Sequence, residues 1–170
     1  KIGVNTNYPF VITRLLDEVL SKNDIFDEII CCGNKKVLKD ISDKLPNSKI
    51  KFKFYEHDSF LKQIAEAKMV ISSPGLTTAF ESFNLKTPMF FLPPQNYSQY
   101  WNLDTFSKRK IATNALNWNN IYPESNIIKN EEQLIGIKKV LSCVNSFEND
   151  EMVQQKVKDY IEKIIKNYIH

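Results

Sequence analysis

Short apolar runs of strand length alternate with longer stretches of helical period along the first two thirds of the chain. This alternation is typical of βα units that build a parallel sheet. The apolar runs predict six strands, at residues 1–4, 28–32, 50–55, 69–72, 88–92 and 111–113. We therefore expect an α/β fold, a Rossmann-like three-layer sandwich with a mostly parallel six-stranded sheet.

The stretches between these runs place apolar residues three and four positions apart, which gives each predicted helix one apolar face. The expected faces are Val11, Leu15, Leu16 and Val19, then Val37, Ile41 and Leu45, then Phe60, Leu61, Ile64 and Ala65. After Pro123 the alternation stops, and C-terminal helices are expected at residues 131–144 and 151–169. Their apolar stripes are Leu134, Ile137 and Leu141 in the first, and Val153, Val157, Ile161 and Ile164 in the second.

The length of 170 residues suits one full-sized hydrophobic core and is short for two. Residues 1–170 are therefore expected to form a single domain. The chain begins directly in a predicted strand, and its first residue is Lys1 instead of Met. We therefore expect it to be a piece of a longer protein.

Charge and cysteine content narrow the class of partner. The 23 Lys and Arg and 20 Asp and Glu are scattered along the chain and give a net charge of +3, without the basic stripe of a nucleic-acid binder. The three cysteines, Cys31, Cys32 and Cys143, are an odd number and favour a reduced compartment. No apolar run reaches membrane-span length and no signal peptide is visible, so a cytoplasmic location is expected.

The best candidate for a ligand site is the loop after the fourth predicted strand. In parallel α/β sheets, ligands bind beyond the carboxyl ends of the strands, where helix N-termini offer unpaired N–H groups. Residues 72–78 read Ser-Ser-Pro-Gly-Leu-Thr-Thr and lead into a predicted helix at residues 79–84. Gly75 lets a phosphate approach the backbone, the hydroxyls of Thr77 and Thr78 add hydrogen-bonding groups, and Glu81 could hold a ribose. The alternative is an ordinary capping box, with Thr78 as the cap and Glu81 three residues later.

A second polar loop follows the fifth predicted strand and should lie beside the first. Residues 93–102 read Pro-Pro-Gln-Asn-Tyr-Ser-Gln-Tyr-Trp-Asn. Ser98 and Gln99 could hydrogen-bond sugar hydroxyls, whereas Tyr100 and Trp101 are expected to pack beneath the loop and hold its shape.

Taken in order, these segments resemble a known family, the glycosyltransferases of GT-B fold, and within it the C-terminal, donor-binding half of MurG-like enzymes. The resemblance rests on residues 69–81, on the run Pro-Met-Phe-Phe-Leu-Pro at residues 88–93, and on Gln-Tyr-Trp-Asn at residues 99–102. MurG-like enzymes transfer N-acetylglucosamine from its UDP carrier. The resemblance thus implies a nucleotide-sugar donor, with UDP-sugar favoured, and an N-terminal acceptor-binding domain or partner subunit.

Residue roles follow from the resemblance. It assigns the diphosphate to Gly75, Thr77 and Thr78, the ribose to Glu81, and the donor sugar to Gln99. Leu76 is a further candidate for the diphosphate and Ser98 for the donor sugar. The family's base-binding loop follows the third strand, which places the nucleobase against the backbone near Glu56 and His57. The His57 side chain itself is expected to be an ordinary loop residue. The chain departs from the family in its first loop, residues 5–10, which contains no glycine, and in Pro74 at the phosphate loop.

Other chemistries find little support. The sequence has no Gly-x-Ser-x-Gly, Walker-type, His-Glu-x-x-His or Cys-x-x-Cys motif, so no metal and no cofactor are expected. Cys31 and Cys32 are interpreted as small buried residues, and Lys108, Arg109 and Lys110 as a solvated helix end with phosphate neutralisation as the alternative. The last helix carries lysines around its apolar stripe, at Lys156, Lys158, Lys163 and Lys166, and could touch an anionic membrane, but packing on its own domain is the simpler account.

The sequence therefore predicts the donor-binding domain of a glycosyltransferase. No residue has the features of a catalytic base, so the isolated chain is expected to bind donor and to transfer poorly. Two alternatives stay open: a nucleotide-sugar hydrolase of the same fold and a non-catalytic nucleotide-binding module.

Overall fold

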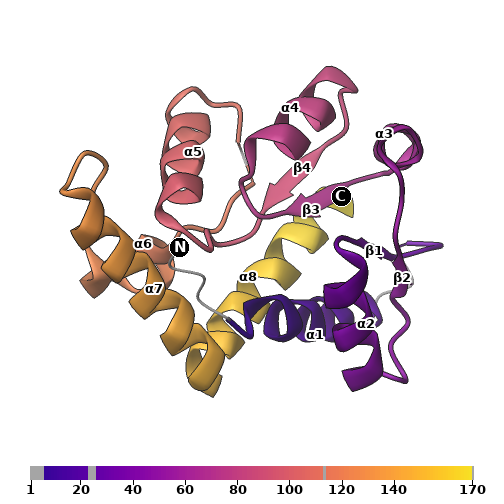
Figure 1. Cartoon of the computed structure of the whole chain (residues 1–170), viewed down its shortest axis with the longest axis horizontal. Helices are drawn as coiled ribbons and strands as arrows, with labels where there is room; N and C mark the ends of the chain where they lie inside the picture. Colours follow the sequence, from indigo (N-terminus) through magenta and orange to yellow (C-terminus); the bar gives the residue numbers. More distant parts are fainter. Residues whose placement is uncertain (1–5, 23–25, 113, 170) are drawn as a thin grey trace. The chain divides into compact units, whose positions relative to one another are not determined.

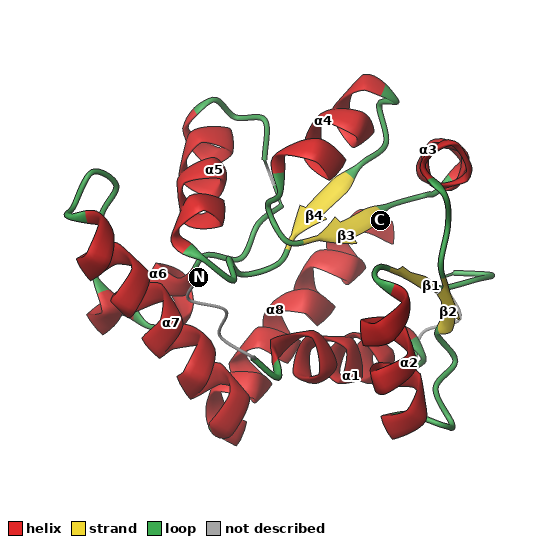
Figure 2. Ribbon diagram, in the orientation of Figure 1, coloured by secondary structure: helices red, strands yellow, loops and turns green. Residues whose placement is uncertain are grey.

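The computed structural model of the chain describes residues 6–22, 26–112 and 114–169, and it is a mixed α/β structure in which helices dominate and the strands are short (Figures 1 and 2). The strand expected at residues 1–4 lies outside the described residues. The chain divides into two compact units, one formed by Lys1–His57 with Glu148–His170 and the other by Asp58–Phe147. They are called here the terminal unit and the central unit.

The terminal unit contains a parallel pair of strands, β1 (Ile30–Cys32) and β2 (Lys51–Lys53). Three helices accompany this pair: α1 (Tyr8–Leu20), α2 (Lys35–Lys44) and the long C-terminal α8 (Glu151–Ile169). α1 packs against both α2 and α8. The strands and helices lie where the apolar runs and the helical periods predicted them, but β1 is two residues and β2 three residues shorter than predicted.

The apolar face of α8 is buried, as the simpler interpretation of its sequence expected. Asp150 caps the helix by accepting hydrogen bonds from the N–H groups of Met152 and Val153. The buried stripe consists of Val153, Val157, Ile161 and Ile165, so that Ile165 takes the place predicted for Ile164. One of the surrounding lysines, Lys158, pairs with Glu18 of α1 at 2.7 Å.

The central unit is built on a second parallel pair, β3 (Val70–Ser72) and β4 (Met89–Phe91), which pair from Val70 with Met89 to Ser72 with Phe91. The strand expected at residues 111–113 does not form at Ile111 or Ala112, and Thr113 lies outside the described residues. Instead, Ala115 bridges Phe91 in parallel, three residues later. Each pair is a sheet of its own within the described residues, and the six-stranded sheet stays a prediction.

Helices complete the central unit. In chain order they are α3 (His57–Glu66), α4 (Leu76–Asn84), α5 (Tyr97–Lys108), α6 (Trp118–Ile121), the 3-10 turn η1 (Pro123–Ser125) and α7 (Gln133–Asn149). A cluster of Ala79, Phe91, Leu103 and Phe106 joins α4 and α5 to β4. The rings of Phe91 and Phe106 stack with their centroids 5.5 Å apart, and Phe83 meets Phe106 edge to face. This cluster fixes the start of α4 relative to β4.

The buried faces of α2 and α7 differ from those predicted. In α2 the buried residues are Leu38 and Ile41, whereas Val37 is 43% exposed. In α7 the predicted Leu134 is 57% exposed, and the buried face runs from Gly136 through Val140 and Val144. Gly136 carries no apolar signal, yet it belongs to this face because the Tyr97 ring lies directly over it: a Cβ atom at Gly136 would stand 2.3 Å from the ring.

The contact between Gly136 and Tyr97 yields a stability prediction. Gly136→Ala should lower the free energy of unfolding by about 1–3 kcal/mol, the usual cost of overpacking, because the Tyr97 ring must move. The matched control is Gly33→Ala, where a Cβ would make only ordinary contact with Leu38 at 3.8 Å. Urea unfolding followed by circular dichroism measures both, and equal midpoints for the two variants would contradict the prediction.

Candidate functional site

The polar loops that the sequence singled out leave the central unit at the same edge. Because β3 and β4 are parallel and in register, Ser72 and Phe91 end side by side. The ladder continues for one more bond, in which the N–H of Leu92 donates to the Ser72 carbonyl at 2.9 Å. The β3–α4 loop and the β4–α5 loop therefore start from neighbouring points, as predicted.

The β3–α4 loop leads into a helix whose first turn has no side-chain cap. α4 begins at Leu76 with Gly75 as the N-cap residue in an extended conformation, and no side chain within the described residues caps it. Its first helical bond runs from Ala79 N–H to the Gly75 carbonyl, so the three preceding N–H groups, those of residues 76–78, have no partner in the helix itself. The capping-box interpretation of Thr78 is therefore wrong, because Thr78 is already the third residue of the helix.

Gly75 borders open space. A Cβ atom added there would have one neighbour within 4 Å, the Ser73 carbonyl oxygen at 4.0 Å. The backbone of Gly75 has φ −76° and ψ 145°, which any residue can adopt, so the missing side chain matters for access and not for conformation. The start of α4 can consequently be approached closely by a ligand.

The remaining positions of α4 separate into faces. Ala79 and Ser82 are buried against the rest of the central unit. Thr77 and Thr78 lie four and three residues before Glu81, a spacing that puts the three side chains on one side of the helix. Thr77 is exposed, and Thr78 and Glu81 are half-buried. A ligand at the helix start could therefore contact the amides, a hydroxyl and a carboxylate together.

The second loop is shorter than expected, because α5 begins within it. Asn96 is the N-cap of α5 and accepts a hydrogen bond from the Gln99 N–H at 2.9 Å. The loop proper is therefore residues 93–96, and Ser98 and Gln99 belong to the first turn of α5. Ser98 is exposed and Gln99 is half-buried, whereas Tyr100 is buried beneath them as predicted. Trp101 is 36% exposed, which is more than its expected packing role requires.

Two hydrogen bonds tie the loops to each other. Gln95 Nε2 donates to Ser73 Oγ at 2.7 Å, and Asn102 Nδ2 donates to the Pro74 carbonyl at 2.9 Å. Within the second loop, the Gln95 N–H donates to Gln99 Oε1 at 2.8 Å. Gln95 and Asn102 thus join the site although the sequence assigned them no role. The sequence contained one signal for Asn102, its place at the end of the Gln-Tyr-Trp-Asn run at residues 99–102.

The expected base-binding residues belong to the terminal unit. Glu56 is exposed in the segment after β2, and His57, also exposed, is the first residue of α3 and not a loop residue. Their role stays a prediction.

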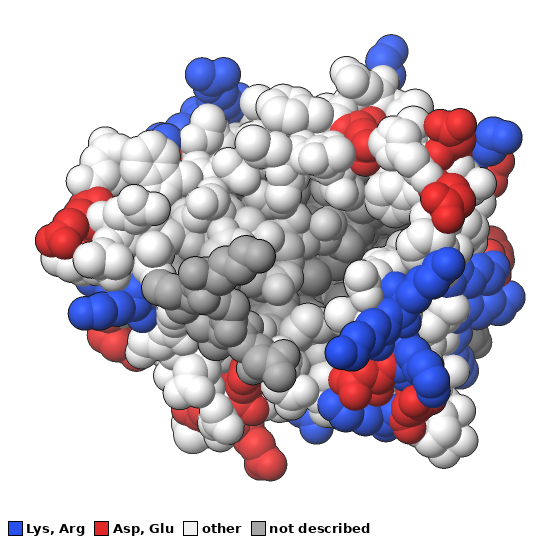
Figure 3. Space-filling view, viewed as in Figure 1, with Lys and Arg blue, Asp and Glu red and all other residues white. Residues whose placement is uncertain are grey.

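The basic run at the end of α5 does not serve the loops. Lys108 pairs with Asp104 at 3.0 Å, and Arg109 and Lys110 are exposed. They stand at the opposite end of the helix from Asn96, with Lys108 roughly 18 Å away by helical rise. The interpretation as a solvated helix end is thus preferred. In Figure 3 the side chains over α4 and α5 are mostly uncharged, whereas Lys and Arg gather with Asp and Glu over α2.

The cysteines are poor nucleophiles. Loss of solvent around the sulfur raises the pKa of Cys31, and raises the pKa values of Cys32 and Cys143 to about 11. All three thiols are therefore protonated at neutral pH. Cys31 is half-buried and Cys32 exposed, so the expected burial of this pair is only partly met.

The rest of the described chain adds little to the site. A pocket of about 330 Å³ lies between α7 and the segment before it, lined among others by Lys139 and Cys143, and contains none of the predicted site residues. Within residues 6–22, 26–112 and 114–169 there is no cluster of His, Cys, Asp or Glu that could hold a metal ion. Among these residues no helix has the length and apolar character needed to span a bilayer.

Comparison with known families identifies the chain. The model of the glycosyltransferase family 28 C-terminal domain matches residues 11–164. A search of curated proteins and a search of solved structures found no match. The family match covers both polar loops, the whole central unit and most of the terminal unit. The chain belongs to the glycosyltransferase family 28 C-terminal domain family, and it is the donor-binding domain of a glycosyltransferase.

Proposed function

We propose that this domain binds a nucleoside-diphosphate sugar, with a UDP-sugar favoured, at the edge formed by the β3–α4 and β4–α5 loops. The observation that carries the proposal is the uncapped start of α4, held beside the second polar loop by the Gln95–Ser73 and Asn102–Pro74 hydrogen bonds. In a domain of this family, such a helix start is the natural place for the diphosphate.

The diphosphate is proposed to accept hydrogen bonds from the N–H groups of Leu76, Thr77 and Thr78. Their orientation along the helix axis adds the partial positive charge of the helix start, which favours an anion. The open space at Gly75 admits the phosphate oxygens to the backbone, and the Thr77 and Thr78 hydroxyls supply further donors. We propose that Glu81, on the same side of α4, accepts hydrogen bonds from the ribose hydroxyls.

The donor sugar is proposed to lie against the first turn of α5. Gln99 uses its Oε1 atom to hold the Gln95 N–H, which leaves its amide NH₂ to donate to a sugar hydroxyl. Ser98 is exposed on the same turn. The nucleobase is proposed to contact the backbone near Glu56 and His57. None of these proposed roles requires a metal or cofactor.

The chemistry proposed for this domain is stabilisation of the leaving group. As the bond from sugar to diphosphate breaks, negative charge grows on the diphosphate, and amides and hydroxyls fixed at the start of α4 stabilise that charge. Deprotonation of the acceptor requires a general base, which we assign to an N-terminal acceptor-binding domain or a partner subunit. The proposed whole is a cytoplasmic GT-B enzyme in which this domain is the donor-binding half.

The first prediction concerns the ribose. Glu81→Ala should weaken UDP binding about tenfold, because hydrogen bonds to a charged carboxylate are the stronger kind. Isothermal titration with UDP, GDP, CDP and TDP measures this and identifies the base. Glu66→Ala is the matched control, because Glu66 is an exposed carboxylate at the end of α3. Equal UDP affinity for wild type and Glu81→Ala would remove Glu81 from the site.

The second prediction concerns the anchor of the phosphate loop. Asn102→Leu keeps the approximate volume but removes the donor to the Pro74 carbonyl. UDP and UDP-N-acetylglucosamine should both bind about three- to tenfold more weakly, by similar factors, since the lost bond supports the part that binds the diphosphate. A loss confined to the sugar nucleotide would contradict this assignment.

The third prediction separates transferase from hydrolase. The isolated chain should bind UDP-N-acetylglucosamine without releasing free sugar, because no residue here is assigned as a base that activates water. Chromatographic detection of N-acetylglucosamine after prolonged incubation checks this. Sugar release by wild type that disappears in Glu81→Ala would favour the hydrolase alternative instead.

A further inference from the structure

The β4–α5 loop is anchored from inside the central unit by α6. Trp118, the first residue of α6, is fully buried, and its indole Nε1 donates to the Pro94 carbonyl at 2.6 Å. Pro94 directly precedes Gln95, and it is buried as well. The indole packs against Phe147, with ring centroids 5.9 Å apart. One buried hydrogen bond therefore fixes the backbone at Pro94, next to Gln95, whose N–H holds the Gln99 side chain.

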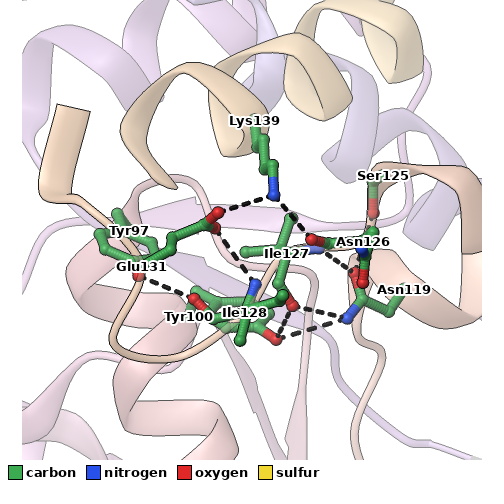
Figure 4. A network of polar contacts seen from close by, with 9 residues as sticks. All are labelled: Tyr97, Tyr100, Asn119, Ser125, Asn126, Ile127, Ile128, Glu131 and Lys139. Atoms are coloured by element: carbon green, nitrogen blue, oxygen red, sulfur yellow. Dashed lines mark hydrogen bonds and ion pairs between the residues drawn. The ribbon is translucent and has the colours of Figure 1, made fainter. Parts of the chain in front are cut away.

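The segment after Trp118 anchors the first turn of α5 through a second set of contacts, drawn in Figure 4. The Tyr100 hydroxyl donates to the Ile127 carbonyl at 2.6 Å, and Asn119 Nδ2 donates to the same carbonyl at 2.9 Å. Asn119 Oδ1 accepts from the Ile127 N–H at 3.1 Å, so the two residues are bound reciprocally. The Tyr97 hydroxyl donates to the next carbonyl, that of Ile128, at 2.8 Å.

This network is held in turn by an ion pair. Glu131 Oε1 accepts from the Ile128 N–H at 3.1 Å, while Lys139 Nζ contacts Glu131 Oε2 at 2.6 Å and the Asn126 carbonyl at 2.8 Å. Burial raises the pKa of Glu131, but the hydrogen bonds from Lys139 and the Ile128 N–H, together with the charge of Lys139, outweigh it and lower the pKa overall. Such a fully bonded network gives segment 118–128 one defined position beneath α5.

We propose that Trp118 is a positioning residue for recognition of the donor sugar, supported by the Tyr100–Ile127 contact. This inference rests on the proposed function. Trp118 is fully buried and therefore cannot contact the ligand directly. It acts through its hydrogen bond to the Pro94 carbonyl, which fixes the position of the neighbouring Gln95 N–H. The Gln95 N–H in turn holds the Gln99 side chain by donating to Gln99 Oε1.

The two halves of the proposed site have different main anchors. The phosphate loop is fixed chiefly by Asn102 at Pro74 and by the packing of Ala79, and the Gln95–Ser73 hydrogen bond links it to the segment that Trp118 anchors. The first turn of α5 is fixed by Trp118 and Tyr100. Loosening the second anchor should therefore lower affinity for the sugar part much more than affinity for the diphosphate.

The test uses Trp118→Phe and Tyr100→Phe, each of which removes one polar group and keeps an aromatic ring. UDP and UDP-N-acetylglucosamine are titrated into the full chain, and the ratio of their affinities is compared with that of wild type. We expect UDP affinity to change less than about twofold and the sugar nucleotide to lose about three- to tenfold in either variant. Phe147→Leu is the matched control, because it disturbs the packing of the Trp118 indole but removes no hydrogen-bonding group.

The outcomes separate this inference from the proposed function. If wild type binds neither UDP nor UDP-N-acetylglucosamine, the proposed function fails and the positioning role fails with it. If wild type binds both and either folded variant keeps the wild-type affinity ratio, only the positioning role is overturned. If Phe147→Leu shifts the ratio as much as Trp118→Phe does, the effect is general packing, and the role is overturned as well.

Discussion

The parallel, in-register pairing of β3 with β4 is the constraint on which the site depends. It makes two loops that are distant in sequence leave the sheet at neighbouring points. The Gln95–Ser73 and Asn102–Pro74 hydrogen bonds then hold the loops together. The aromatic cluster of Phe83, Phe91 and Phe106 secures α4 and α5 on the same strand pair. Contacts within the chain thereby place a helix start and a polar turn side by side.

The chain belongs to the glycosyltransferase family 28 C-terminal domain family, and this membership connects the two loops with glycosyl transfer. A fold alone would leave hydrolase, transferase and binding module equally open. We propose that α4 binds the charged diphosphate through amides and hydroxyls, and that the first turn of α5 binds the neutral sugar through amide and hydroxyl side chains. The main anchors of the two elements differ, so a change at Trp118 or Tyr100 is expected to affect selectivity for the sugar more than affinity for the nucleotide.

Much of this was predictable from the sequence, because the predictable parts are local. The order of strands and helices follows from apolar periods, and the two loops from glycine, proline and hydroxyl residues between them. The errors lie where tertiary packing decides. The capping-box pattern at Thr78 predicted a later helix start than the one found at Leu76. That prediction failed because a cap contributes only about 1 kcal/mol, which is too little to decide where the helix begins. The buried face of α7 was misplaced because Gly136 fits Tyr97 without an apolar side chain. The roles of Gln95 and Trp118 depend on partners more than 20 residues away.

The central claim is that the amides at the start of α4 bind a diphosphate. The most direct measurement is a titration of the ¹⁵N-labelled chain with UDP, followed by the amide chemical shifts of Gly75, Leu76, Thr77 and Thr78 in NMR spectra. Our account predicts that these four amides shift together and saturate at one dissociation constant, and that uridine without phosphates leaves them nearly unmoved. UDP binding that leaves the four amides unshifted, with the changes concentrated elsewhere in the chain, would contradict it.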